Sequence, residues 1–121
     1  MATYSTFEEL KVWQTSRTLN KNLFNLLMDK DDRKYGFLIN HIFKTAGSVM
    51  DNIAEGHGRQ GTKEYILFLS YSLGSADELR SQLYRAMDLE IISESDFEII
   101  RKQCVDINSQ LTYFTNYLKK N

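Results

Sequence analysis

The chain has 121 residues, of which 42% are hydrophobic and 26% are charged, and its net charge is −1. A chain of this length suits one domain that buries roughly two thirds of its unfolded surface, so we expect a single domain over residues 1–121. The small net charge argues against a strongly basic, constitutive nucleic-acid binder. No apolar run approaches the roughly 20 residues that cross a bilayer.

The first residues contain no basic stretch followed by an apolar one, so we expect no secretory signal. Cys104 is the single cysteine and cannot form an internal disulfide. These features predict a reducing, cytoplasmic location and no membrane partner.

The absence of proline means that helix breaks must come from glycines and polar clusters. Thr6 and Glu9 form a capping-box pattern at the start of a first predicted helix, which extends to Met28. Its apolar residues recur at helical spacing: Leu10, Trp13, Leu19, Leu23, Leu26 and Leu27. The charged run at 29–34 predicts a solvated loop.

A second predicted helix has apolar residues at i, i+3 and i+4 spacing: Ile39, Ile42, Phe43, Ala46, Val49, Met50 and Ile53. It should stop at Gly56, where we expect a left-handed cap residue. Thr62 is the expected N-cap of a third helix, from Lys63 to about Leu89.

A fourth predicted helix opens at Ser93, with Asp96 at its third position, and continues to Leu118. Its apolar residues alternate spacings of three and four, which is the heptad pattern of a helix packed at a shallow angle: Phe97, Ile100, Cys104, Ile107, Leu111, Phe114 and Leu118. Four helices with short connections predict an all-α, up-down-up-down antiparallel four-helix bundle.

The third predicted helix is more apolar than one core requires, which predicts burial on a second side. In a small bundle that second burial is most simply a subunit interface, formed by Tyr65, Phe68, Tyr71, Gly74 and Tyr84. Gly47 and Gly74 lie in helix interiors, at a cost of about 1 kcal/mol each relative to alanine. Such a cost suggests close helix approach; the alternative is that they are tolerated surface glycines.

Asn52, Glu55 and Arg59 lie at i, i+3 and i+7 and so share one helix face, with Glu55 and Arg59 at salt-bridge spacing. We expect this polar cluster to be architectural, locking the following turn or bonding a neighbouring helix. The alternatives are a catalytic site, which would need a concave pocket with converging polar groups, or a binding site.

The run from Gly56 to Gly61 matches G-x-G-x-x-G, but a helix precedes it where a dinucleotide site needs a strand. A weaker anion site remains at the start of the third helix beside Arg59 and Lys63, with a simple capped turn as the alternative. Neither His41 nor His57 follows a glutamate at the spacing of a di-metal bundle site, and Cys104 occupies a core position where thiols are inert. We expect no metal, no cofactor and no enzymatic activity.

Four segments, in order and covering nearly the whole chain, resemble a bacterial four-helix-bundle family: Phe7–Trp13, Asn52–Gly56 with Arg59, Lys63–Phe68 and Gly74–Leu79. That family includes proteins encoded in 23S ribosomal RNA intervening sequences and accessory proteins of diversity-generating retroelements. The resemblance implies a ring-shaped homopentamer with no known enzymatic activity. For retroelement members it also implies binding to reverse transcriptase and to nucleic acid through a basic surface.

We therefore expect a non-enzymatic homo-oligomeric scaffold or adaptor, most simply a pentamer, with an unidentified macromolecular partner. The alternative is an RNA- or DNA-binding accessory protein. Its candidate contacts are Lys11, Arg17, Lys21, Arg59 and Lys63. Because Glu8, Glu9, Glu55 and Glu64 are interleaved with these cations, we expect nucleic-acid binding to be weak or absent.

Overall fold

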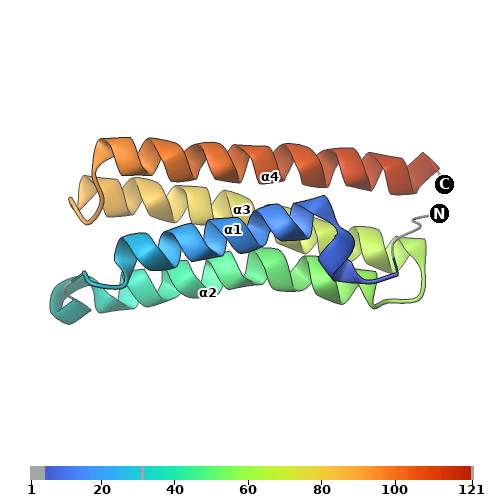
Figure 1. The fold of residues 1–121 in the computed structure, drawn as a ribbon, viewed down its shortest axis with the longest axis horizontal. Helices are drawn as coiled ribbons and strands as arrows, with labels where there is room; N and C mark the ends of the chain where they lie inside the picture. Colours follow the sequence, from blue (N-terminus) through green and yellow to red (C-terminus); the bar gives the residue numbers. More distant parts are fainter. Residues whose placement is uncertain (1–4, 31, 121) are drawn as a thin grey trace.

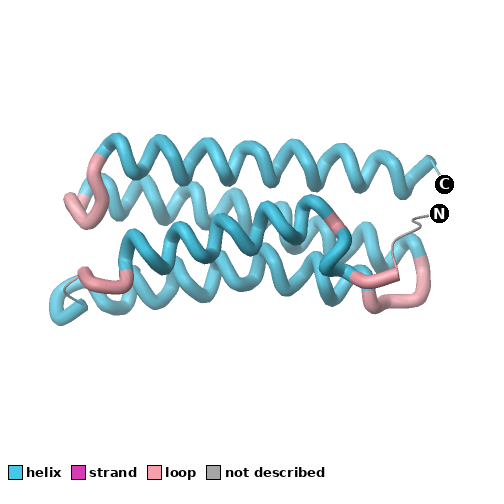
Figure 2. The backbone as a smooth tube through the Cα atoms, viewed as in Figure 1, coloured by secondary structure: helices cyan, strands magenta, loops and turns pink. Residues whose placement is uncertain are grey.

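The computed structural model describes residues 5–30 and 32–120. One turn of 3-10 helix, η1 (Phe7–Glu9), precedes four long helices: α1 (Lys11–Leu27), α2 (Asp32–His57), α3 (Thr62–Asp88) and α4 (Glu94–Lys120). The helices run alternately in opposite directions (Figure 1) and are joined by short loops (Figure 2). The predicted up-down-up-down four-helix bundle is confirmed.

Each long helix packs against two neighbours, in the order α1, α2, α3, α4 and back to α1. The core between them consists of aliphatic side chains that are almost fully buried, among them Leu19, Leu23, Ile42, Ile53, Leu69, Leu79, Leu83, Ile107, Leu111 and Leu118. Burying each such side chain contributes about 1.5–3 kcal/mol relative to leaving it exposed. No described helix has the length and apolar character that a membrane span requires.

The predicted seam of α4 faces this core. Six of its seven residues are buried (Phe97, Ile100, Cys104, Ile107, Leu111 and Leu118), and Phe114 is half-buried and packs against them. Ser93 caps α4 as predicted, because its Oγ accepts the backbone N–H of Asp96 at 3.1 Å. The N–H groups of a first helical turn lack partners within the helix, so this bond stabilises the start of α4.

The starts of the other helices differ from the predictions by a few residues. The Thr6–Glu9 capping box heads η1, and Leu10 interrupts the helix with an extended backbone (φ −74°, ψ 125°), so α1 begins at Lys11. Thr62 is the first residue of α3 and Gly61 its N-cap. The predicted loop 29–34 is shorter than expected: α2 already begins at Asp32, with a kink at Tyr35 (φ −121°, ψ 20°).

The expectation of a left-handed residue at Gly56 is wrong. No described glycine has a positive φ, and α2 continues through Gly56 to His57. Gly56 is instead a point of close approach, since a Cβ there would lie 2.9 Å from Phe68 Cβ on α3. The left-handed residue of the described chain is Glu90 (φ 61°), in the turn between α3 and α4.

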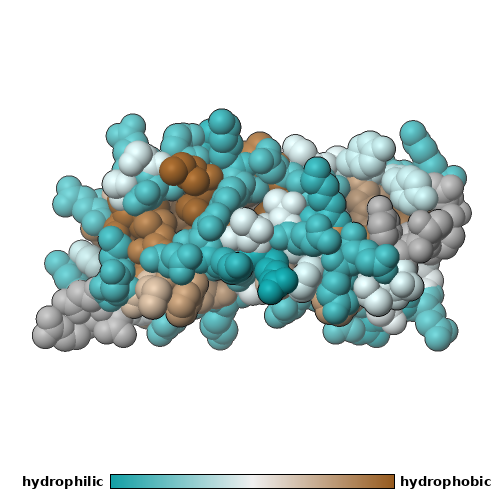
Figure 3. Space-filling view, viewed as in Figure 1, coloured by the Kyte–Doolittle hydropathy of each residue, from teal (hydrophilic) through white to brown (hydrophobic). Residues whose placement is uncertain are grey.

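Apolar atoms are unevenly distributed over the face seen in Figure 3. Brown and tan atoms gather in the half that holds the end of α1, the start of α2 and the α3–α4 turn, whereas teal atoms dominate elsewhere on the same face (Figure 3). Phe24 and Met28 at the end of α1, and Ile99 in the first turns of α4, have 53%, 58% and 58% of their surface exposed.

Candidate functional site: the outer surface of α2 and α3

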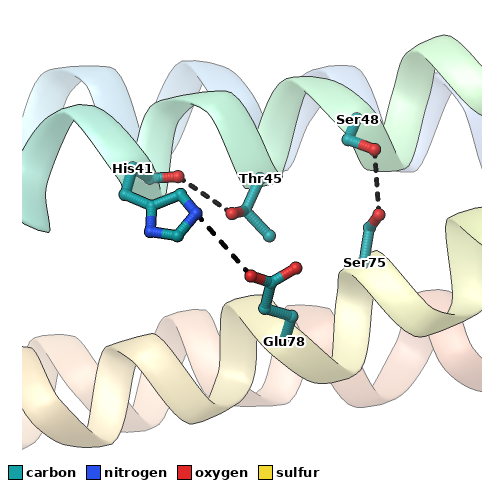
Figure 4. Close-up of polar contacts among 5 residues, drawn as sticks. All are labelled: His41, Thr45, Ser48, Ser75 and Glu78. Carbon is teal, nitrogen blue, oxygen red and sulfur yellow. Dashed lines mark hydrogen bonds and ion pairs between the residues drawn. The ribbon is translucent and has the colours of Figure 1, made fainter.

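Polar side chains of α2 and α3 meet along the outside of the pair (Figure 4). The hydroxyls of Ser48 and Ser75 lie 2.9 Å apart and share a hydrogen bond. Asn52 Nδ2 donates to the backbone oxygen of Ser48 at 2.9 Å and contacts Ser48 Oγ at 3.0 Å. The Ser48–Ser75 hydrogen bond links the two helices, and Asn52 bonds to Ser48 at one side of this link.

Two further contacts join α2 to α3 near the Ser48–Ser75 hydrogen bond. Beneath it, the buried Ser72 donates its hydroxyl to the backbone oxygen of Val49 at 2.6 Å. One turn beyond Ser75, Glu78 Oε2 lies 3.7 Å from His41 Nε2, and both side chains are about half exposed (54% and 53%). An exposed ion pair of this kind contributes at most about 1 kcal/mol. The buried hydrogen bond from Ser72 to Val49 therefore does more to fix the two helices.

Arg59 links the end of α2 to the first turns of α3. Its guanidinium lies 3.1 Å from Glu55, as the four-residue spacing predicts, and 4.7 Å from the centre of the Phe68 ring. Phe68 in turn contacts Tyr71 edge to face, with ring centres 5.4 Å apart. A cation over an exposed ring contributes about 0.5–1 kcal/mol, so these contacts together hold the α2–α3 turn.

The polar cluster expected from the sequence therefore divides into two parts. Glu55 and Arg59 act at the turn, whereas Asn52 bonds back into its own helix at Ser48. Each side chain is engaged in a contact within the α2–α3 pair.

The five residues expected at a subunit interface have different environments. Tyr71 is 48% exposed and Gly74 is exposed on the outside of α3. Leu67, 46% exposed, was missed by the sequence analysis although it precedes them at i, i+4 and i+7 spacing, which places all three on one side of the helix. We refer to Leu67, Tyr71 and Gly74 as the α3 stripe. Tyr84 is 48% exposed, and its ring packs against the Phe97 ring of α4, with ring centres 4.7 Å apart.

Tyr65 belongs to the core, with 4% of its surface exposed, and so presents no surface to another subunit. Its ring packs edge to face against Phe114 at 5.4 Å and against His57 at 6.0 Å. Burial raises the pKa of its phenol, and the phenolic oxygen is buried without a hydrogen-bond partner. A buried polar atom of this kind lowers stability, which the packing of the ring must outweigh.

The close helix approach expected at Gly47 and Gly74 is not found within the subunit. A Cβ built on either glycine would have no atom within 4 Å. Glycine inside a helix lowers stability by about 1 kcal/mol relative to alanine. The packing of this chain does not explain why either position has glycine and not alanine.

The basic residues considered for nucleic-acid binding lie in three places. Arg17 and Lys21 line a cavity between α1 and α2. Lys11 borders a different, apolar cavity between α1 and α4, beside Tyr113. Arg59 and Lys63 are at the α2–α3 turn. Of these five residues, Arg17 and Lys21 line the same cavity.

The sequence also raised two other kinds of chemistry, nucleophilic catalysis at Cys104 and metal binding. Burial raises the pKa of the Cys104 thiol to about 12, which disfavours the thiolate that nucleophilic chemistry and metal binding require. Among the described residues, no group of three or more histidine, cysteine, aspartate or glutamate side chains could hold a metal ion.

Comparison with known proteins identifies the chain at the level of a family. No curated protein shows significant similarity to it. A crystal structure from Bacteroides thetaiotaomicron, of a protein with unknown function from the S23 ribosomal protein family, superposes with a TM-score of 0.78 and 22% sequence identity. The superposition covers 86% of this chain and 97% of that one, and it shows a shared fold. The family described as 23S rRNA-intervening sequence protein matches residues 8–113, and the chain belongs to that family.

Proposed function

We propose that this protein is a non-enzymatic subunit of a homo-oligomer, and that it acts as a scaffold or adaptor for a macromolecular partner. Self-association through the α3 stripe is the core of the proposal. The observation that carries it is Gly74, an exposed glycine in the middle of a 27-residue helix with open space around its Cα.

No contact within the chain explains why position 74 has glycine, which lowers the stability of the helix. Alanine would fit, because a Cβ meets no atom within 4 Å, and would stabilise the helix by about 1 kcal/mol. A glycine gains a role if the backbone of a second copy lies against it, since small residues allow close helix approach. Leu67 and Tyr71, each nearly half exposed on the same side of α3, would then be buried by that copy.

A five-membered ring is the stoichiometry that the family resemblance favours. Five copies related by rotation would use two different surfaces of each subunit, one presented forwards and one backwards. The α3 stripe supplies one of these surfaces in the proposal. The contacts of Asn52, Glu55 and Arg59 within the α2–α3 pair support an architectural role for these residues, as a scaffold requires.

Light scattering coupled to size exclusion tests the proposal. The wild-type protein at micromolar concentration should have a mass of five times the 14.2 kDa chain. Gly74→Arg should give a folded monomer, because the added side chain has room within the subunit but would block the approach of a second copy. Circular dichroism would confirm that its helices are intact.

Asn116→Arg, which adds the same charge at an exposed position of α4, is the matched control and should remain oligomeric. A monomeric wild-type protein would refute the proposal as a whole. An oligomeric wild type whose mass survives Gly74→Arg would show that the α3 stripe is not the interface.

A further inference from the structure

The cavity between α1 and α2 is lined by cationic, amide and aromatic side chains. Its volume is about 490 Å³, and it is lined by Arg17, Asn20, Lys21, Phe24 and Asn25 of α1 and by Phe43 of α2. Two cations, two amides and two phenyl rings therefore surround one space, without a carboxylate. Small-molecule sites typically occupy about 300–1,000 Å³ and place a few polar groups among apolar ones.

The two cations at this cavity have no carboxylate partner in the part of the chain that the structure describes. The sequence of α1, from Lys11 to Leu27, contains three basic residues and no acidic one. Neither Arg17 nor Lys21 forms an ion pair with a carboxylate among the described residues. Two adjacent cations without a counter-charge attract an anionic group such as a phosphate.

None of the four glutamates that led us to expect weak nucleic-acid binding, Glu8, Glu9, Glu55 and Glu64, lines this cavity. Glu9 accepts hydrogen bonds from Ser5 and Thr6 in the capping box of η1, and Glu55 pairs with Arg59 at the end of α2. Glu64 lies in the first turn of α3. The charges are interleaved along the sequence, but the residues that line the cavity include no carboxylate.

The phenyl rings give the cavity a surface for a planar group. Phe24 is 53% exposed, and Phe43 supports it from α2, with ring centres 6.1 Å apart and planes inclined by 44°. A planar group between two parallel rings needs about 7 Å, twice the roughly 3.5 Å contact distance of carbon atoms. The rings are too close for that, so a base would stack on the outer side of Phe24.

The spacing along α1 suits a ligand with a phosphate at one end and a base at the other. Arg17, Lys21 and Phe24 lie at i, i+4 and i+7 on one side of the helix. At a rise of about 1.5 Å per residue, Lys21 is roughly 4.5 Å along the axis from Phe24, and Arg17 roughly 6 Å further. A phosphate held between the two cations would leave its base beside Phe24.

Asn20 provides a fixed polar group within this arrangement. Its Nδ2 donates to the backbone oxygens of Ser16 and Ala46, both at 2.9 Å, which ties α1 to α2 and holds the amide in one orientation. The Oδ1 atom can then accept a hydrogen bond from a sugar hydroxyl or a base. Asn25, an exposed amide, lines the cavity nearby.

We propose that this cavity, the Arg17–Phe43 pocket, binds a nucleotide, with Arg17 and Lys21 on the phosphate and Phe24 stacked on the base. The ligand is a free nucleotide or one residue of a single-stranded nucleic acid, since both present the same phosphate and base. Duplex nucleic acid does not fit, because its bases are already stacked within the helix. The pocket does not depend on self-association through the α3 stripe.

The test measures binding of a labelled single-stranded RNA, an RNA duplex of the same length, adenosine monophosphate and inorganic phosphate to the wild-type protein and its variants. Phe24→Ala should weaken binding of the nucleotide or the single strand about fivefold or more through lost stacking, while Phe37→Ala, at a 71% exposed ring of α2, should not. Arg17→Gln should lower the salt slope of single-strand binding by about one, and Lys102→Gln should lower it less.

Each arm of the experiment has a defined meaning. Single-stranded RNA that binds far more tightly than the mononucleotide supports the proposal and assigns the pocket to a strand, whereas similar affinities support it and assign the pocket to a free nucleotide. The proposal is overturned if neither ligand binds, if inorganic phosphate binds as tightly as adenosine monophosphate, if Phe24→Ala has no more effect than Phe37→Ala, or if the duplex binds as well as the single strand. Circular dichroism confirms that the variants are folded.

Discussion

Gly56 and Gly47, both inside α2, have different surroundings. Gly56 is buried where α2 crosses α3, and a Cβ there would lie 2.9 Å from Phe68 Cβ and 3.1 Å from Tyr65 Cδ1. Gly47, two and a half turns earlier in the same helix, has open space around it. The first glycine is required by packing within the subunit, and the second is not.

Gly56→Ala should lower the free energy of unfolding by about 1–3 kcal/mol, the usual cost of forcing a methyl group into a filled core. The nearest atom is a Cβ, which cannot move without its backbone. Urea denaturation followed by circular dichroism measures the change. Gly47→Ala is the matched control and should raise the free energy of unfolding by about 0.5–1 kcal/mol. Equal stability of the two variants would contradict the packing argument.

Glu90 lies in a backbone conformation that favours glycine. With φ at 61°, it follows the end of α3 in a Schellman motif: its N–H donates to Met87, and the N–H of Ile91 donates to Ala86, both at 2.9 Å. Glycine is the usual residue at this position because it has no Cβ to clash with the backbone.

Glu90→Gly should therefore raise the free energy of unfolding by about 1 kcal/mol, since a left-handed conformation costs an L-residue about 1–2 kcal/mol and the greater freedom of glycine in the unfolded chain offsets part of the gain. Thermal denaturation measures the effect. Glu94→Gly, which places a glycine in the first turn of α4, should lower stability and serves as control. If Glu90→Gly lowers the melting temperature, the carboxylate of Glu90 has a role that its backbone does not reveal.

At the scale of the element, α4 shows how far a repeating pattern determines structure. Leu111 belongs to its buried seam and is 1% exposed. Leu111→Ala should lower the free energy of unfolding by about 2–5 kcal/mol, through lost transfer energy and the cavity left behind. Thr112→Ala, at the next and exposed position, should change stability by less than about 0.5 kcal/mol. Chemical denaturation of the two variants would test whether the seam faces the core.

The helices could be predicted because apolar residues repeat every three or four positions over long stretches, and the cap at Ser93 because its partner Asp96 is local. The errors have non-local causes. Gly56 was expected to end α2 through its backbone freedom, yet its role depends on Phe68 of another helix. Tyr65 was expected on the surface because α3 is apolar around much of its circumference, and only the position of Phe114 shows it to be buried.

The candidate sites were predictable to different extents for the same reason. The Glu55–Arg59 pair follows from four-residue spacing on one helix. The Arg17–Phe43 pocket could not be assembled from the sequence, because it needs Phe43 of α2 beside Lys21 of α1. Leu67 could have been found, since it shares the spacing of Tyr71 and Gly74.

At the scale of the whole molecule, proposed self-association links stability to concentration. If the α3 stripe is buried in an oligomer of folded subunits, the melting temperature should rise with protein concentration, because association stabilises the folded state by mass action. Differential scanning fluorimetry over a hundredfold dilution series would show this. Gly74→Arg should remove the dependence; a wild-type melting temperature that is constant across the series would argue against assembly in this range.

The even number of antiparallel helices has a consequence for how the molecule can be tethered. η1 and the end of α4 lie at one end of the bundle, and the α1–α2 and α3–α4 turns lie at the other (Figure 1). A cargo fused before Ser5 or after Lys120 would therefore emerge from the same pole. In a cyclic assembly, every copy of that cargo would be displayed on a single rim. Several weak attachments presented together bind far more tightly than one, so such a ring would act as a multivalent platform.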